Sequence, residues 1–192
     1  GSYQVTHDSL PGIVNGSYVH RREFGISKGT FWSPKGNYLA FYRKDERDVT
    51  DYPVLDINER VAENKPVKYP IAGMKSHKVQ VGVFDLETKE TLFLKTKDNK
   101  DRYFTNITWG PGEKFIYIAE LNRDQDHLEL VKYDAKTGER VKVLFEEKHK
   151  KYVEPENGLT FFKNKPGQFM WFSERIGYNH LYIYNTEGEM LE

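Results

Sequence analysis

A segment that recurs about every fifty residues constrains the fold of this chain more than any other feature. Each copy joins an aromatic strand end, an Asp or Asn and a polar turn, and the copies span residues 83–90, 132–139 and 183–189. Asp85, Asp134 and Asn185 begin the three turns, 49 and 51 residues apart. The short side chain of Asp or Asn bonds the backbone of a tight turn, so each copy predicts a β-hairpin.

A second repeated unit precedes each hairpin, and in it Pro and Gly separate two apolar strands. The three copies of this unit lie at residues 31–36, 108–112 and 161–167. Alternating apolar residues resume after each unit, which is typical of a half-exposed strand. Each period therefore holds four strands, the content of one β-propeller blade. We expect an all-β fragment of a β-propeller, with about three four-stranded antiparallel blades and a ring that is not closed.

The repeat also predicts where each blade begins and ends within one partial propeller domain, residues 1–192. Residues 3–24 are expected to end one blade, 29–96 and 103–146 to form full blades, and 158–192 to form an incomplete one. Because a ring fragment exposes blade faces and strand edges that neighbours would cover, we expect the chain to form a homo-oligomer.

The first full blade carries an insertion at about residues 43–78. Trp32 and Trp109 occupy equivalent places in the repeat, and their separation exceeds one period by about two dozen residues. Pro53 and Pro70 argue against central strands in the insertion, because proline cannot donate to a β-ladder. We expect a long excursion from the blade rim, with a short helical turn at residues 61–63.

Composition excludes several classes of function. Lys+Arg and Asp+Glu both total 29, whereas a nucleic-acid-binding chain would carry a basic excess. The absence of cysteine excludes disulfides, thiol catalysis and zinc–thiolate sites. No apolar run approaches the roughly 20 residues of a membrane span. The first residues do not form a signal peptide, so any export signal is expected upstream.

Candidates for chemistry within the chain are weak, and we expect no catalytic residue, cofactor or metal site. Ser27 stands in a G-x-S-x-G pattern, but a nucleophile elbow needs a helix after the serine, and here another strand follows. Six histidines show no metal-ligand spacing with one another: they are His7, His20, His77, His127, His149 and His180. Two segments are more distinctive, the charged cluster 20–25 and the turn 173–182 between aromatic strands.

Together these segments resemble a known family. The chain is similar to the N-terminal propeller of the dipeptidyl peptidase IV and prolyl tripeptidyl peptidase group of serine aminopeptidases, within the prolyl oligopeptidase family, especially in Bacteroides-like bacteria. The resemblance covers nearly the whole chain, and its carriers are residues 19–25, 31–36, 50–53, 69–73 and 173–182.

The resemblance implies a role in a larger hydrolase. In that family an eight-bladed propeller caps an α/β-hydrolase domain that carries Ser, Asp and His. Peptides with proline near the N-terminus enter a cavity between the domains, and acidic propeller side chains hold the free α-amine. The chain is then the non-catalytic portion that gates and binds the peptide N-terminus. A periplasmic or cell-envelope location follows from the same resemblance.

The resemblance also implies the site residues. Dipeptidyl peptidase IV has adjacent glutamates where this chain reads Arg21-Arg22-Glu23, so one carboxylate remains, as in the tripeptidyl peptidases. Release of dipeptides and of tripeptides both stay open. Glu23 is the implied anchor for the α-ammonium, and Arg21 and Arg22 either orient it or hold a substrate carbonyl. The alternative is a surface Glu23 paired with one arginine, worth ~0–1 kcal/mol.

Two other functions stay open. The chain can belong to a binding propeller without a peptidase domain. It can also belong to a family member that has lost catalysis and serves as an interaction scaffold. A nucleophile elbow followed by Asp and His downstream in the parent gene would separate these functions from the peptidase.

Overall fold

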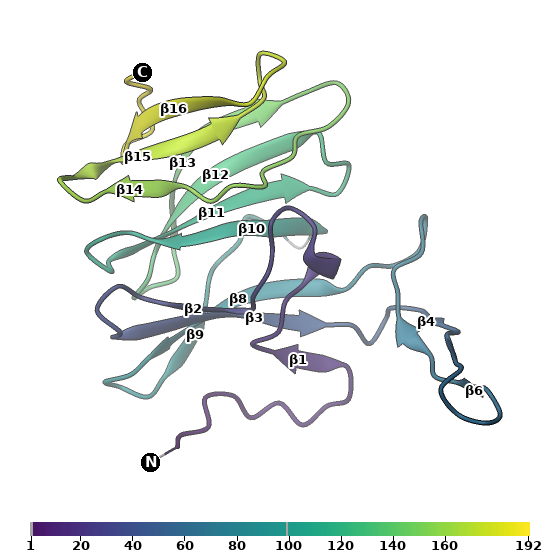
Figure 1. Ribbon diagram of the computed structural model, residues 1–192. Coiled ribbons are helices and arrows are strands. Elements are labelled where there is room, and N and C mark those ends of the chain that lie inside the picture. The colour runs from purple at the N-terminus through teal and green to yellow at the C-terminus, as the bar shows by residue number, and fades with distance from the viewer. Residues whose placement is uncertain (1, 99) are drawn as a thin grey trace.

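A stack of antiparallel β-sheets forms the body of the structure, a computed structural model that describes residues 2–98 and 100–192 (Figure 1). Three larger sheets follow one another along the chain, and four two-residue strands form an arm at one side. Within these residues the only helix is the 3₁₀ turn η1 (His20–Arg22). No helix in this part of the chain is long and apolar enough to cross a membrane. The predicted fold class is confirmed: the sheets are consecutive blades of an unclosed β-propeller.

The first sheet has one edge that is built in two pieces. Its strands are β1 (Ile13–Asn15), β2 (Thr30–Trp32), β3 (Tyr38–Asp45), β8 (Lys78–Asp85) and β9 (Thr91–Phe93). Both β1 and β2 pair with β3. In these pairings Asn15 lies opposite Arg43, and Thr30 lies opposite Phe41. The structure differs here from the expectation that residues 3–24 end a preceding blade, since β1 belongs to the first sheet.

The second and third sheets are simple meanders. The second contains β10 (Arg102–Trp109), β11 (Phe115–Asn122), β12 (His127–Asp134) and β13 (Arg140–Lys148), and the third contains β14 (Thr160–Phe162), β15 (Lys165–Ser173) and β16 (His180–Asn185). The backbone of Ile183 in β16 accepts from Leu191 and donates to Glu192, both at 2.7 Å. The last residues therefore bond β16 where a fourth strand would lie.

The predicted hairpin turns are confirmed in atomic detail. Oδ1 of Asp85 accepts the backbone N–H groups of the second and third residues after it, at 2.8 and 3.2 Å. Asp134 repeats both bonds at 2.9 and 3.0 Å. Asn185 accepts from the second and fourth residues after it, at 3.0 and 2.9 Å. One side-chain device therefore shapes the turn in all three sheets.

Two apolar clusters hold the sheets together. Ile116 and Ile118 of β11 join the cluster between the first two sheets, whereas Tyr117 and Ala119 join the cluster on the other side. Successive side chains of a strand point to opposite faces, so β11 is buried on both. The core therefore lies between blades rather than within one sheet.

Polar bonds add links between the first and second sheets. The indole Nε1 of Trp109 donates to the carbonyl of Phe31 at 2.8 Å. The buried carboxylate of Glu113 accepts the backbone N–H of Lys35 at 2.5 Å and Nδ2 of Asn37 at 2.7 Å. These bonds join the Pro-Gly turns of two neighbouring blades.

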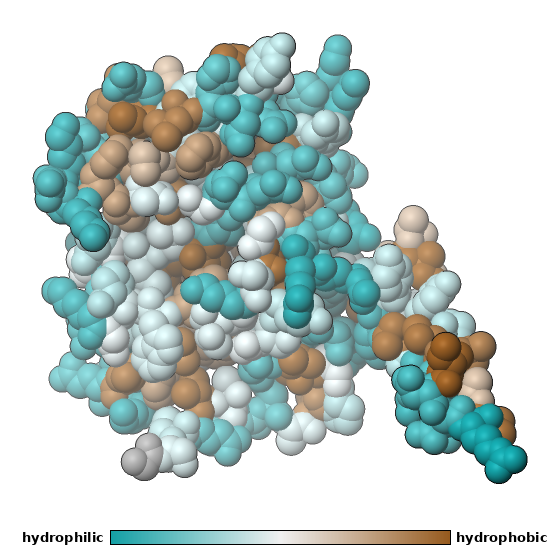
Figure 2. All heavy atoms as spheres, viewed as in Figure 1, coloured by the Kyte–Doolittle hydropathy of each residue, from teal (hydrophilic) through white to brown (hydrophobic). Residues whose placement is uncertain are grey.

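The predicted insertion forms an arm between β3 and β8. Its paired strands are β4 (Asp51–Tyr52) with β7 (Val67–Lys68) and β5 (Leu55–Asp56) with β6 (Glu63–Asn64). Figure 2 shows brown apolar side chains gathered on this projection, where Ile57 is 80% and Val61 78% exposed. The helical turn expected at residues 61–63 is wrong, because strand β6 begins at Glu63.

Candidate functional site

A loop that interrupts the edge of the first sheet carries the predicted site residues. Residues 16–29 leave the sheet after β1, form η1 and return at β2, and Figure 1 shows this purple loop rising to the level of β10. His20, Arg21 and Arg22 have φ angles of 50°, 52° and 69°, and Phe24 follows at 55°. Residues with a Cβ rarely adopt this left-handed conformation. The run marks a strained turn, and such strain clusters at functional sites.

The side chains of Arg21, Arg22 and Glu23 are all exposed on this turn. The guanidinium of Arg21 lies 4.7 Å from the ring centroid of Tyr69, and that of Arg22 lies 4.5 Å from the ring of Tyr18. In the described part of the chain, neither arginine forms an ion pair with Glu23. The rings hold the arginines by cation–π attraction, and the carboxylate of Glu23 faces solvent.

Aromatic side chains pack against the buried residues of this turn. The ring of His20, which is 6% exposed, lies between the rings of His77 and Tyr103, with centroids 4.7 and 4.8 Å away. Phe24 packs on the same Tyr103 with centroids 5.0 Å apart. Sequence reasoning missed these partners, because they come from β10 and from the end of the arm. No linear pattern signals a contact between residues 57 positions apart.

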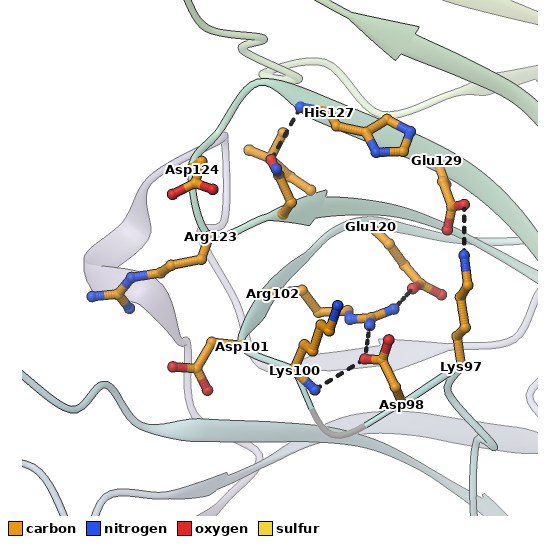
Figure 3. A pocket seen from close by; sticks show the side chains of 12 residues that line it. Lys97, Asp98, Lys100, Asp101, Arg102, Glu120, Arg123, Asp124, His127 and Glu129 are labelled. Carbon is orange, nitrogen blue, oxygen red and sulfur yellow. Dashed lines mark hydrogen bonds and ion pairs between the residues drawn. The ribbon is translucent and has the colours of Figure 1, made fainter.

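A charged cleft of about 570 Å³ lies beside the hairpin between β11 and β12 (Figure 3). Its charges largely satisfy one another. Glu120, buried at its base, accepts from Nη1 of Arg102 at 2.6 Å and from the hydroxyl of Tyr133. Burial and the nearby Glu120 carboxylate raise the pKa of Tyr133. Lys97 lies 3.6 Å from Glu129 at the rim. The residues that line the cleft therefore form an ion-pair network, which stabilises the second sheet.

One group has the composition of a metal site. Possible ligand atoms of His127, Glu129 and Glu146 lie within 4.8 Å of one another, because the register of β12 and β13 places Glu129 opposite Glu146. The histidine spacing did not predict this group. However, Arg140 bonds Glu129 at 2.6 Å and Lys148 bonds Glu146 at 2.8 Å. Because both carboxylates are already neutralised, the geometry describes an ion-pair cluster.

Ser173 and Arg175 anchor the distinctive turn 173–182 to the second sheet, whereas residues 174–181 are exposed. Buried Glu147 accepts from Trp171 at 2.7 Å, Ser173 at 2.8 Å and Arg175 at 2.7 Å. Arg175 also donates to the hydroxyl of Tyr184 at 2.7 Å. This network lines part of a cavity of about 320 Å³ between the second and third sheets. The turn therefore fastens β15 and β16 to the end of β13.

Ser27 lies exposed in the loop between η1 and β2. The helix that a nucleophile elbow requires does not follow it, since the next element is strand β2. Among residues 2–98 and 100–192, no side-chain hydrogen bond joins Ser27 to a histidine. The arrangement around the loop can bind a charged ligand, and Glu23 is its exposed anion.

The sequence of this chain matches a known protein family and several relatives. Residues 1–192 match the family model of the dipeptidyl peptidase IV (DPP IV) N-terminal region. A probable dipeptidyl-aminopeptidase B of Tuber melanosporum is 32% identical over 160 residues, covering 72% of this chain and 17% of the relative. One from Uncinocarpus reesii is 28% identical over 189 residues, covering 85% of this chain and 20% of the relative. The chain thus spans less than a quarter of these relatives.

Solved structures agree. A putative dipeptidyl aminopeptidase IV from Bacteroides ovatus is 54% identical, with a TM-score of 0.90 over 96% of this chain and 26% of its own. Dipeptidyl peptidase 4 of Porphyromonas gingivalis is 26% identical, with a TM-score of 0.87 over 99% of this chain and 28% of its own. The chain therefore belongs to the family of the dipeptidyl peptidase IV N-terminal region.

Proposed function

We propose that this chain is the peptide-binding propeller portion of a prolyl-specific dipeptidyl or tripeptidyl aminopeptidase, in which Glu23 binds the α-ammonium of the substrate. The observation that carries the proposal is the exposed Glu23 carboxylate, which has no ion-pair partner among the described residues. An ammonium group needs such an anion when it leaves water. Membership in the family and the names of its relatives support the peptidase activity of the whole protein.

The arginines complete the binding surface. Cation–π contacts occupy the faces of both guanidinium groups, over Tyr69 and Tyr18. No hydrogen bond within the described residues uses the N–H groups at the guanidinium edges, so each can donate to a carbonyl of an extended peptide. Arg21 and Arg22 therefore bind the substrate backbone, while Glu23 binds its amine. The α/β-hydrolase domain of the parent protein supplies the nucleophile, so this chain selects and positions the peptide.

Glu23→Gln in the full-length enzyme tests this function. Loss of the charged anchor should lower kcat/KM for a free-amine prolyl substrate by roughly 2–4 kcal/mol, about 30- to 900-fold. The N-acetylated substrate should change little. Glu90→Gln is the matched control, because Glu90 is another exposed glutamate, located in the hairpin between β8 and β9. Equal kinetics for Glu23→Gln and wild type would refute the amine-anchor role.

The proposal extends to location. A peptidase that takes up peptides by their free N-termini suits a periplasmic or cell-envelope protein, as the family resemblance implies. Fractionation of the source cells, with a cytosolic enzyme as marker, checks this expectation. Recovery of the parent protein with the cytosolic marker would contradict it.

A further inference from the structure

The turn that presents Glu23 does not hold its own shape. Four of its five residues from His20 to Phe24 have positive φ, and Glu23 alone is extended, with φ −62° and ψ 161°. The turn has few backbone hydrogen bonds of its own, such as that from the Glu23 N–H to the His20 carbonyl at 3.0 Å. These are too few to enforce four left-handed residues. Left-handed residues persist only where surrounding contacts over-determine them. The contacts that do this are those of His20 and Phe24.

These two side chains flank the exposed residues and meet on one ring. His20 lies just before Arg21 and Phe24 just after Glu23, and both are buried against Tyr103. The Tyr103 hydroxyl accepts from Nε2 of Gln125 at 3.3 Å, which ties the ring to the hairpin after β11. The exposed triplet is therefore fixed at both ends to the second sheet.

Hydrogen bonds fix the charge state of His77 and the direction of its bond with His20. Nε2 of His77 accepts the backbone N–H of His20 at 3.2 Å, so this nitrogen carries no proton. Nδ1 of His20 lies 3.0 Å from the same nitrogen and must donate to it. His77 is then neutral. Nε2 of His20 is buried and has no hydrogen-bond partner in the described part of the chain, so burial favours a neutral ring there as well. A proton on Nε2 of His77 would point at the backbone N–H of His20 and break that bond.

The surroundings favour the neutral pair. Burial, followed by the nearby His77 and Arg123, holds the pKa of His20 well below its usual 6.5. Burial also lowers the pKa of His77 to about 4, with Lys44 and Arg123 acting in the same direction. Glu46 and Asp101 oppose this shift only in part. These groups come from β3, from the residues after it, from the loop before β10 and from the hairpin after β11.

His77 also links the turn to the arm. It lies directly before β8, where the arm rejoins the first sheet. The arm contributes a second contact, since Tyr69 follows β7 and lies under the guanidinium of Arg21. The positions of His77 and Tyr69 therefore both depend on the arm. The other two described sheets carry no such insertion.

We infer that His20 and His77 are positioning residues for peptide recognition: their neutral, hydrogen-bonded pair sets where the Glu23 carboxylate stands. This inference rests on the proposed function. The pair touches no substrate and acts through the turn. Displacing the turn would move the anion away from the ammonium without altering the catalytic groups of the parent enzyme, so binding of free-amine substrates should suffer selectively.

Two substitutions at His77 in the full-length enzyme test the inference. Leu removes the acceptor, whereas the Gln amide oxygen can replace Nε2 as acceptor and cannot be protonated. We expect His77→Leu to raise KM for the free-amine substrate about tenfold or more, with kcat within twofold and the N-acetylated substrate unaffected. His77→Gln should restore KM to within about threefold of wild type. An unchanged KM in His77→Leu, an equal loss for both substrates, or an equal loss in Gln and Leu would overturn it.

Hydrogen exchange supplies a readout that needs no activity. The amides of Arg22, Glu23 and Ile26 donate within the turn. They should lose protection in His77→Leu and keep it in His77→Gln, while β11 stays protected in both. Unchanged protection of the turn in His77→Leu would overturn the inference. The proposed function fails separately: if Glu23→Gln leaves kinetics unchanged, Glu23 is not the anchor, whatever the His77 variants show.

Discussion

The matching edges of the first two sheets differ, and the difference shows where function can reside. In the second sheet β10 is a single strand from Arg102 to Trp109 along β11, with one β-bulge between Thr105 and Thr108. In the first sheet two three-residue strands share the same place along β3, and residues 16–29 leave the sheet between them. In a continuous strand the backbone groups bond the neighbouring strands and many side chains pack in the core. The interruption frees a short segment to present charged side chains to solvent.

The charges of the two regions reflect this difference. Glu120 in the second sheet is 3% exposed and bonded to Arg102 and Tyr133. Glu23 on the loop is exposed and has no ion-pair partner in the described part of the chain. The same residue type thus serves stability in one region and recognition in the other. Four predictions test this contrast.

The largest expected effect comes from removing the buried carboxylate. Glu120→Ala should lower the free energy of unfolding by about 3–5 kcal/mol, because the hydroxyl of buried Tyr133 loses its acceptor and half-buried Arg102 keeps only Asp98 as a partner. Glu23→Ala should change it by less than about 0.5 kcal/mol, as for an ordinary surface position. Urea denaturation of both variants checks the pair. Similar losses would erase the distinction between the two regions.

A pair of glycines gives the next test. Gly25 has φ +69°, and an added Cβ would meet the Glu156 carbonyl oxygen at 2.2 Å. Gly36 has φ +77° and no atom within 4 Å of such a Cβ. Gly25→Ala should therefore destabilise by about 2–4 kcal/mol and Gly36→Ala by about 1 kcal/mol. Thermal unfolding measures both, and equal losses would mean that the loop yields at Gly25.

The pH dependence of stability should reveal the imidazole pair. The pKa of His77 is about 4 in the folded chain, against 6.5 for an ordinary histidine. The folded chain therefore binds fewer protons between these values. Its stability is fully present above pH 6.5 and declines as the pH falls towards 4, by roughly 1–3 kcal/mol. His77→Gln should lose less stability over this range in denaturation curves. Identical pH profiles would contradict a half-buried, neutral His77.

The smallest effect concerns the outer faces of the stack. Phe172 and Leu181 of the third sheet are 37% and 47% exposed. They lie near the edge of β16, which the last residues bond at Ile183. We predict that the chain self-associates weakly through this surface. Light scattering over a concentration series should show a rising mass, reduced in Leu181→Lys. A constant monomer mass at high concentration would contradict the prediction.

Local chemistry explains what could be predicted. Asp85, Asp134 and Asn185 act on backbone groups two to four residues away, so their spacing revealed the hairpins without any knowledge of the fold. The sequence could not indicate that β1 joins β3, because that choice depends on which strand edge is free. Nor could it predict that Arg21 and Arg22 would stack on tyrosines rather than pair with Glu23.

The sequence by itself determined the all-β class, the repeated hairpins, the insertion and the family, since each follows from short local patterns and from their spacing along the chain. Only the tertiary structure decided which side chains meet: His20 with His77, His20 and Phe24 with Tyr103, and Glu129 with Glu146. The physical reason is that packing between blades brings distant segments into contact. The energy of those contacts depends on burial and register, which no short stretch of sequence encodes.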